Sequence, residues 1–106
     1  MTKAVMYWSR MRLEVEGHAE YAEPGKDIVC AGVSILTTAL VRTLEEQQLR
    51  GRLKVEYKSE PGRIIVTADP RMDCLNETKA YFRMAVIGLK MLMEEYREFV
   101  VIKEVE

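Results

Sequence analysis

Two short stretches decide how this chain folds, Gly17–Ala19 (GHA) and Gly25–Ser34 (GKDIVCAGVS), with a short loop between them. Alternating apolar and charged residues before the first stretch are typical of a half-exposed strand. In the second stretch, Asp27 is a preferred N-cap residue and precedes an apolar run at helical spacing. The two stretches therefore predict a strand, a loop and a helix that together bring His18 close to Cys30.

The rest of the pattern predicts further strands and one more helix. Strands are expected at about residues 3–8, 11–17, 53–58, 64–68 and 99–105, and helices at about 27–49 and 72–96. Short hairpins favour antiparallel neighbours, so this order (β-β-α-β-β-α-β) predicts an α+β fold. We expect a two-layer sandwich, in which two long helices cover one face of a mostly antiparallel five-stranded sheet. The first helix is expected to bury an apolar face made by Ile28, Val29, Ile35, Leu36, Ala39, Leu40 and Leu44.

Length and composition favour a small globular protein with a single domain, residues 1–106. The formal net charge is −1 and 48% of the residues are hydrophobic, so charge offers no argument for binding nucleic acid or an anionic membrane. We expect no signal peptide and no run that approaches transmembrane length. Two cysteines without a secretory signal favour free thiols and a cytoplasmic location.

The chain has one histidine, and its place favours thiol chemistry. A neutral imidazole is the usual base that activates a thiol, and the first turn of a helix stabilises a thiolate. Ser34 lies one helical turn after Cys30, on the same face. Backbone N–H groups near Val29 and Cys30 are candidates for part of an oxyanion hole. Asp27 either caps the helix only or also orients His18.

At these residues the chain resembles the ribosomal-processing cysteine proteases called Prp. The resemblance rests on GHA at residues 17–19 and on GKDIVCAGVS at 25–34, with a similar spacing from His to Cys. It extends more weakly to Gly88–Leu89 and to Tyr96–Val100. Three departures stand out: Gly32 replaces an alanine and would leave space beside Cys30, Arg97 replaces a common proline, and the first hairpin is short.

The resemblance implies a reaction, a partner and an assembly. Cys30 would be the nucleophile and His18 the base, with Asp27, Ser34 and Gly17 as supporting residues and no cofactor. The family implies a cytoplasmic homodimer that removes an N-terminal extension from large-subunit ribosomal protein L twenty-seven. The cut falls after a Leu-Gln-Phe-Phe-like segment and before Ala. Relatives carried by phages would process capsid or scaffold proteins with a similar segment.

Other interpretations of the same residues stay open. A dimeric module of the same fold would hold the peptide without cutting it, and a small acyl hydrolase is a second alternative. Two Cys and one His without finger spacing make a zinc site improbable. Cys74 has no second histidine to serve it and is expected to be a partly buried structural thiol. Methionines 72, 84, 91 and 93 are expected to fill the core or a dimer interface. The loop Ala19–Lys26 is expected to be a mobile lid over the peptide.

Overall fold

The computed structural model describes all residues, 1–106, and confirms the predicted order of the main elements. The strands are β1 (Thr2–Tyr7), β2 (Arg12–Glu16), β3 (Leu53–Glu60), β4 (Arg63–Pro70) and β5 (Val100–Val105), and the long helices are α1 (Ile28–Leu49) and α2 (Leu75–Glu95). Two short 3₁₀ turns were not predicted, η1 (Trp8–Arg10) and η2 (Met72–Cys74). The first replaces the expected tight turn, and the second takes up the first residues expected in the second helix.

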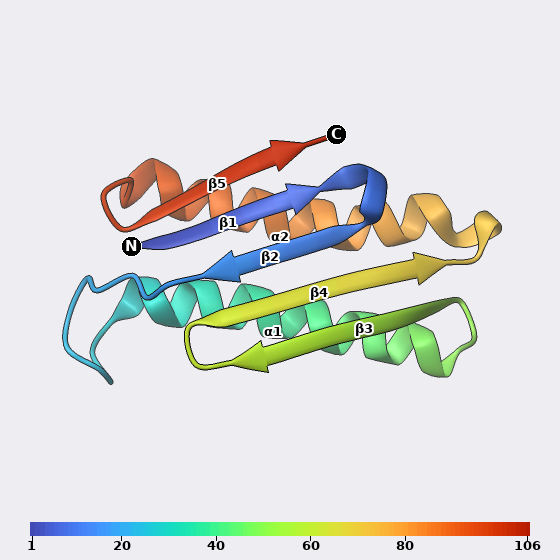
Figure 1. The fold of residues 1–106 in the computed structure, drawn as a ribbon, viewed down its shortest axis with the longest axis horizontal. Coiled ribbons are helices and arrows are strands. Elements are labelled where there is room, and N and C mark those ends of the chain that lie inside the picture. The colour runs from blue at the N-terminus through green and yellow to red at the C-terminus, as the bar shows by residue number, and fades with distance from the viewer.

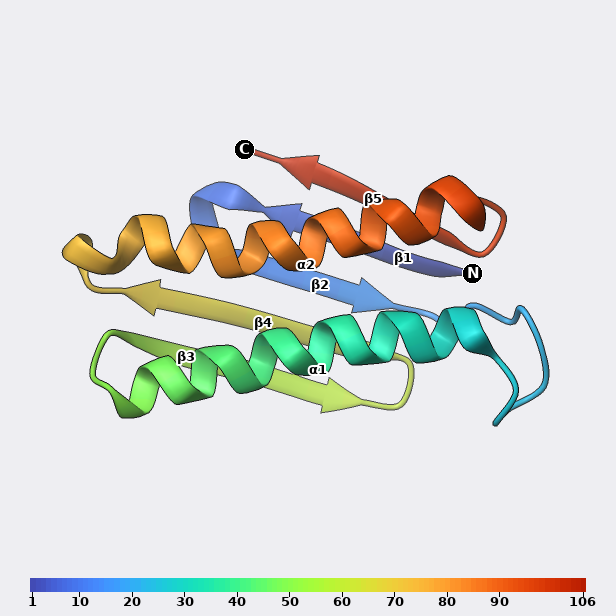
Figure 2. The same cartoon turned by 180° about the vertical axis from the view of Figure 1, so that it is seen from behind.

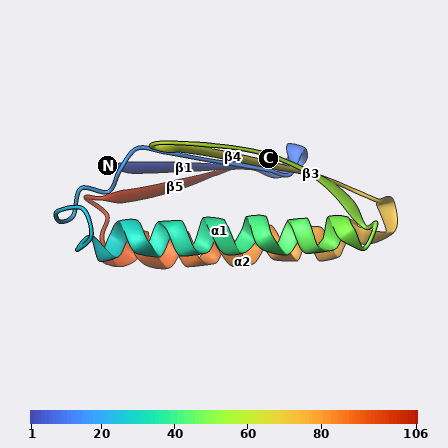
Figure 3. The same ribbon diagram turned by 90° about the horizontal axis from the view of Figure 1, so that it is seen from below.

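The molecule is an α+β sandwich of two layers, as predicted. Both helices lie on the same side of the sheet, and its other side is uncovered (Figures 2 and 3). The strand order is β3-β4-β2-β1-β5. Three neighbouring pairs are antiparallel, and β1 pairs with β5 in parallel, Thr2 opposite Val100 (Figure 1). The first strand therefore lies inside the sheet, between the second strand and the last.

The predicted buried face of α1 is partly wrong. Val29, Leu40 and Leu44 are in the core, but Ile28 and Ile35 are 58% and 66% exposed. The helix instead turns Val33, Thr37 and Val41 inward. The reason is that α1 packs against both the sheet and α2. Its buried face therefore includes the polar Thr37 and leaves out the apolar Ile28 and Ile35. Ala39 is also exposed. Of the four methionines expected in the core or a dimer interface, those at 72, 84 and 91 are exposed and Met93 packs against the core.

The two helices touch through a reciprocal pair of glycines. A Cβ atom on Gly32 would lie 3.2 Å from the Leu92 methyl carbons, and one on Gly88 would lie 2.5 Å from Leu36 Cδ2. Each glycine thus receives a leucine from the opposite helix. The expectation that Gly32 leaves space beside Cys30 is therefore wrong, because that space is filled by Leu92.

A cluster of charges joins β5 to α2 at the edge of the sheet. Glu104 accepts hydrogen bonds from Trp8 Nε1 at 2.8 Å and from Arg83 at 2.9 Å, and it forms an ion pair with Lys90. The Arg83 guanidinium also lies over the Trp8 ring, 4.2 Å from its centroid. The contact with Lys90, followed by the one with Trp8, lowers the pKa of Glu104 to about 2. This carboxylate therefore stays charged and fastens the last strand at all but strongly acidic pH.

Helix α1 is the one helix long and apolar enough, by length and composition, to cross a membrane. The expectation that no run approaches that length is wrong by this criterion. In this fold the same helix places Val29, Val33 and Leu40 in the core beside the sheet. Length and composition alone are weak evidence for a membrane span, since core helices of globular proteins pass the same test.

Candidate active site

His18 sits just beyond the end of β2, where the backbone is shaped by a glycine. Gly17 has φ +89°, and a Cβ atom there would overlap the carbonyl oxygen of Met1. Its N–H donates to the Gly62 carbonyl oxygen at 2.7 Å, which joins the end of β2 to the turn between β3 and β4. Only glycine fits this close approach. The structure thus gives the predicted supporting role of Gly17 a physical basis: it sets the backbone from which His18 projects.

Cys30 is the third residue of α1 and is half-buried. Its position in the first turn follows directly from the Asp27 cap, as predicted. Asp27 Oδ1 accepts the Cys30 N–H at 2.8 Å. The thiol therefore lies at the positive end of the helix dipole, on an element that the cap holds in place.

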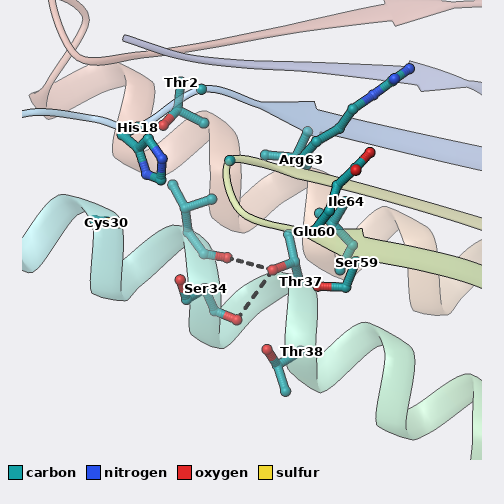
Figure 4. Close-up of a pocket in the computed structure, with 14 residues that line it drawn as sticks. Thr2, His18, Cys30, Ser34, Thr37, Thr38, Ser59, Glu60, Arg63 and Ile64 are labelled. Atoms are coloured by element: carbon teal, nitrogen blue, oxygen red, sulfur yellow. Dashed lines mark hydrogen bonds between the residues drawn. The ribbon is translucent and has the colours of Figure 1, made fainter.

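His18 and Cys30 line the same hollow, which lies between the start of α1 and the β3–β4 turn (Figure 4). Its volume is about 230 Å³. A second hollow of about 720 Å³ opens beside the loop that follows β2. Three residues line both hollows: His18, Cys30 and Ser34. The predicted residues thus stand where the two hollows meet, although no hydrogen bond joins the imidazole to the thiol.

Asp27 accepts three hydrogen bonds, one through Oδ1 and two through Oδ2. Besides capping Cys30 through Oδ1, it accepts the Tyr21 N–H at 2.9 Å and the Ala22 N–H at 3.4 Å through Oδ2. The hydrogen bond from Cys30 is the main cause that lowers the pKa of Asp27 below its usual value. Asp27 makes no hydrogen bond with His18. Of the two roles considered for Asp27, the structure shows capping, and it adds a tie to the loop.

The predicted oxyanion donors are not free. The Cys30 N–H is donated to Asp27, and the Val29 N–H also lies close enough to this carboxylate to help lower its pKa. The prediction is wrong here because the cap and an oxyanion hole compete for the same N–H groups. The Ser34 hydroxyl, in contrast, donates no hydrogen bond to the protein and faces both hollows. It is the available side-chain donor beside Cys30.

The loop after His18 is anchored at one point that the sequence prediction missed. The Tyr21 ring packs edge-on against Tyr96 and Phe99, with centroids 5.3 and 5.2 Å apart. Ala19, at the start of the loop, is buried. The loop is therefore held by an aromatic contact and by Asp27, whereas the prediction treated it as a lid without such anchors.

Cys74 differs from Cys30 in its burial and its surroundings. It is buried beside the start of α2, at the opposite end of the molecule from the start of α1 (Figure 1). Burial, followed by the nearby Asp73 carboxylate, raises the pKa of its thiol. The structure thus confirms that this thiol is buried. No group of three or more His, Cys, Asp and Glu side chains is arranged to hold a metal ion.

A thiol at a helix start and an imidazole across a shared hollow are the parts from which thiol peptidases are built. The family model described as cysteine protease Prp matches residues 1–101. The chain therefore belongs to the cysteine protease Prp family. Among curated proteins, none matches this chain in sequence.

Solved structures share the whole fold. The ribosomal processing protease Prp from S. aureus, in complex with a covalently linked product peptide, is 21% identical with a TM-score of 0.77, covering 98% of this chain and 99% of that one. Its complex with a substrate peptide also gives 0.77, at 18% identity and the same coverage. SMU.848 from Streptococcus mutans gives 0.68 at 26% identity, covering 98% and 91%. At such identities the S. aureus structures establish the fold.

Proposed function

We propose that this chain is an endopeptidase whose nucleophile is Cys30 and whose base is His18. The observation that carries the proposal is that these two residues and Ser34 line both hollows. A peptide running from one hollow to the other would pass the thiol with its scissile bond. A likeness to a protease seen with substrate and product peptides supports this path.

The reaction follows from the chemistry of the three side chains. The Cys30 sulfur forms a bond to the scissile carbonyl carbon while His18 takes the thiol proton. The negative charge that develops on the carbonyl oxygen is stabilised by a hydrogen-bond donor, and we assign this role to the Ser34 hydroxyl. His18 then gives the proton to the leaving amine, and the carbon–nitrogen bond breaks. Water, activated by the same imidazole, hydrolyses the thioester and restores the thiol.

The family likeness suggests the substrate. We propose the extension of ribosomal protein L twenty-seven, cut after paired aromatic residues and before Ala, and for a phage-borne relative a capsid or scaffold protein with a similar segment. The protein would act in the cytoplasm. Ribosomal-protein genes beside this gene would favour the first substrate, and capsid genes the second.

The test is a peptide containing Leu-Gln-Phe-Phe-Ala, incubated with the protein and analysed by mass spectrometry. We expect a single cut between Phe and Ala, whereas Cys30→Ala binds the peptide without cutting it. Cys74→Ala is the matched control and should cut normally, because this thiol is buried far from the hollows. Cutting that persists in Cys30→Ala would overturn the assignment of the nucleophile.

The alternative of a peptide-binding module without catalysis is favoured by one observation, the missing hydrogen bond between His18 and Cys30. Catalytic hydrogen bonds are often long in free enzymes and tighten with substrate, so this geometry is compatible with catalysis. Peptides of this kind that bind the unaltered protein and stay intact would decide for the binding module.

We propose that two copies pair through the outer face of the helices. Large apolar side chains are exposed on both helices, namely Ile28 and Ile35 on α1 and Met84, Ile87 and Met91 on α2. Apolar surface of this kind on a small domain favours association. Light scattering at micromolar concentration should give twice the chain mass of 12.3 kDa, and Ile35→Lys with Met84→Lys should reduce it to one. A monomer in the unaltered protein would refute this assembly.

A further inference from the structure

The turn between β3 and β4 touches the side chain of His18. A Cβ atom on Gly62 would lie 3.1 Å from the His18 Nε2 atom, 3.7 Å from Cδ2 and 3.8 Å from Cε1. The imidazole therefore presents its Nε2 edge to this glycine. Gly62 has φ +77°, a conformation that residues with side chains seldom adopt.

The same residue also holds the backbone that carries His18. Its carbonyl oxygen accepts the Gly17 N–H at 2.7 Å, just past the last paired residues of β2 and β4, Glu16 and Arg63. Gly62 therefore contacts both the main chain beside His18 and the imidazole ring, although it lies more than forty positions later in the chain. Gly62 also lines the hollow that contains Cys30.

We propose that Gly62 is a positioning residue for His18. Because it lacks a side chain, the imidazole can lie against the turn with Nε2 toward it while the ring stays in the hollow with the thiol. A methyl group at this position would stand closer to Nε2 than ordinary van der Waals contact allows, so the ring would have to move by a few tenths of an ångström. Displacements of this order slow a reaction that depends on orientation. The inference rests on the proposed role of His18 as the base.

The chain offers a matched control. Gly51, in the turn before β3, has φ +73°, and a Cβ atom there would meet nothing within 4 Å. Alanine at Gly51 therefore brings the same backbone strain as alanine at Gly62, without the contact to His18. Gly62→Asn is a second variant, because asparagine tolerates positive φ better than alanine and still places a Cβ atom against the ring.

The experiment compares peptide cleavage and the nuclear magnetic resonance signals of the imidazole, which are unambiguous because the chain has one histidine. Gly62→Ala and Gly62→Asn should lower kcat about tenfold or more, with KM within about twofold, and should shift the imidazole signals. Gly51→Ala should match the unaltered protein in kcat and in the imidazole signals.

Imidazole signals that are the same in both Gly62 variants as in Gly51→Ala would overturn the proposal, and so would an unchanged kcat. The imidazole signals decide the question even if the unaltered protein cuts no peptide, so a failure of the proposed function is distinguishable from a failure of this inference. If strain prevents Gly62→Ala from folding, Gly62→Asn supplies the decision.

Discussion

Replacing His18 with alanine is expected to leave the fold intact and to slow peptide cleavage by about 10²–10⁴-fold. The side chain is exposed and makes no hydrogen bond within the protein, so its loss removes little that stabilises the domain. It does remove the group proposed to take the thiol proton and to protonate the leaving amine. Cleavage rates and circular dichroism of the two proteins measure both effects.

The two thiols give this experiment an internal control. Alkylation by iodoacetamide should be faster at Cys30 than at Cys74 in the unaltered protein, because the Cys74 thiol is buried and its pKa is raised. In His18→Ala, labelling of Cys30 should slow while that of Cys74 stays the same. Undiminished cleavage by a folded His18→Ala variant would exclude a Cys–His pair.

Replacing Asp27 with alanine is expected to loosen the start of α1 and the loop together. The cap on the Cys30 N–H and the ties to Tyr21 and Ala22 are lost in one change. From the usual effect of losing a cap, we expect the melting temperature to fall by about 4–8 °C. Limited proteolysis should cut the loop faster, and peptide cleavage should slow as Cys30 loses its fixed position.

Asp27→Asn separates the two functions of the carboxylate. Asparagine caps helices as well as aspartate does, so the Cys30 contact should persist. Its amide NH₂ group, however, cannot accept the Tyr21 N–H. The melting temperature should therefore stay closer to that of the unaltered protein while the loop is still cut faster. Equal protection of the loop in all three proteins would show that the aromatic contacts of Tyr21 alone hold it.

Low pH should remove the stability that Asp27 contributes, as Asp27→Ala does. The pKa of Asp27 is lower in the folded chain than its usual value of 3.8. The carboxylate therefore contributes its full stabilisation when the pH is above that usual pKa. The contribution is lost as the pH falls through the lowered pKa. The difference in melting temperature between the unaltered protein and Asp27→Ala should thus shrink below about pH 4.

Local signals made the order of elements and the main site residues predictable. The Asp27 cap fixes where α1 begins and so fixes Cys30 in its first turn, and the alternating residues of β2 lead to His18. These features depend on neighbours in the chain. The absence of a second histidine argued against a catalytic Cys74, and the expectation of a partly buried thiol agrees with its burial in the structure.

Contacts between distant segments were not predictable in the same way. Nothing in β1 or β5 alone reveals that they pair in parallel, since the pairing depends on where α2 returns the chain. Gly62 reads as an ordinary turn glycine next to Pro61, and its contact with His18 exists only in the folded sheet. The competition for the Cys30 N–H was predictable, because an Asp N-cap accepts from the N–H two or three residues later, which here belongs to Val29 or Cys30.

The paired glycines between the helices limit how the site can open. Because Leu92 packs on Gly32 and Leu36 packs on Gly88, α1 cannot shift along α2 or rotate over it without displacing one of these leucines. The thiol is therefore carried on a helix that packs tightly against α2, whereas the neighbouring segment from Glu20 to Lys26 lies outside this helix pair. A peptide that needs more room at Cys30 has to displace this segment, which requires detaching Tyr21 from its aromatic neighbours and breaking the hydrogen bonds from Tyr21 and Ala22 to Asp27.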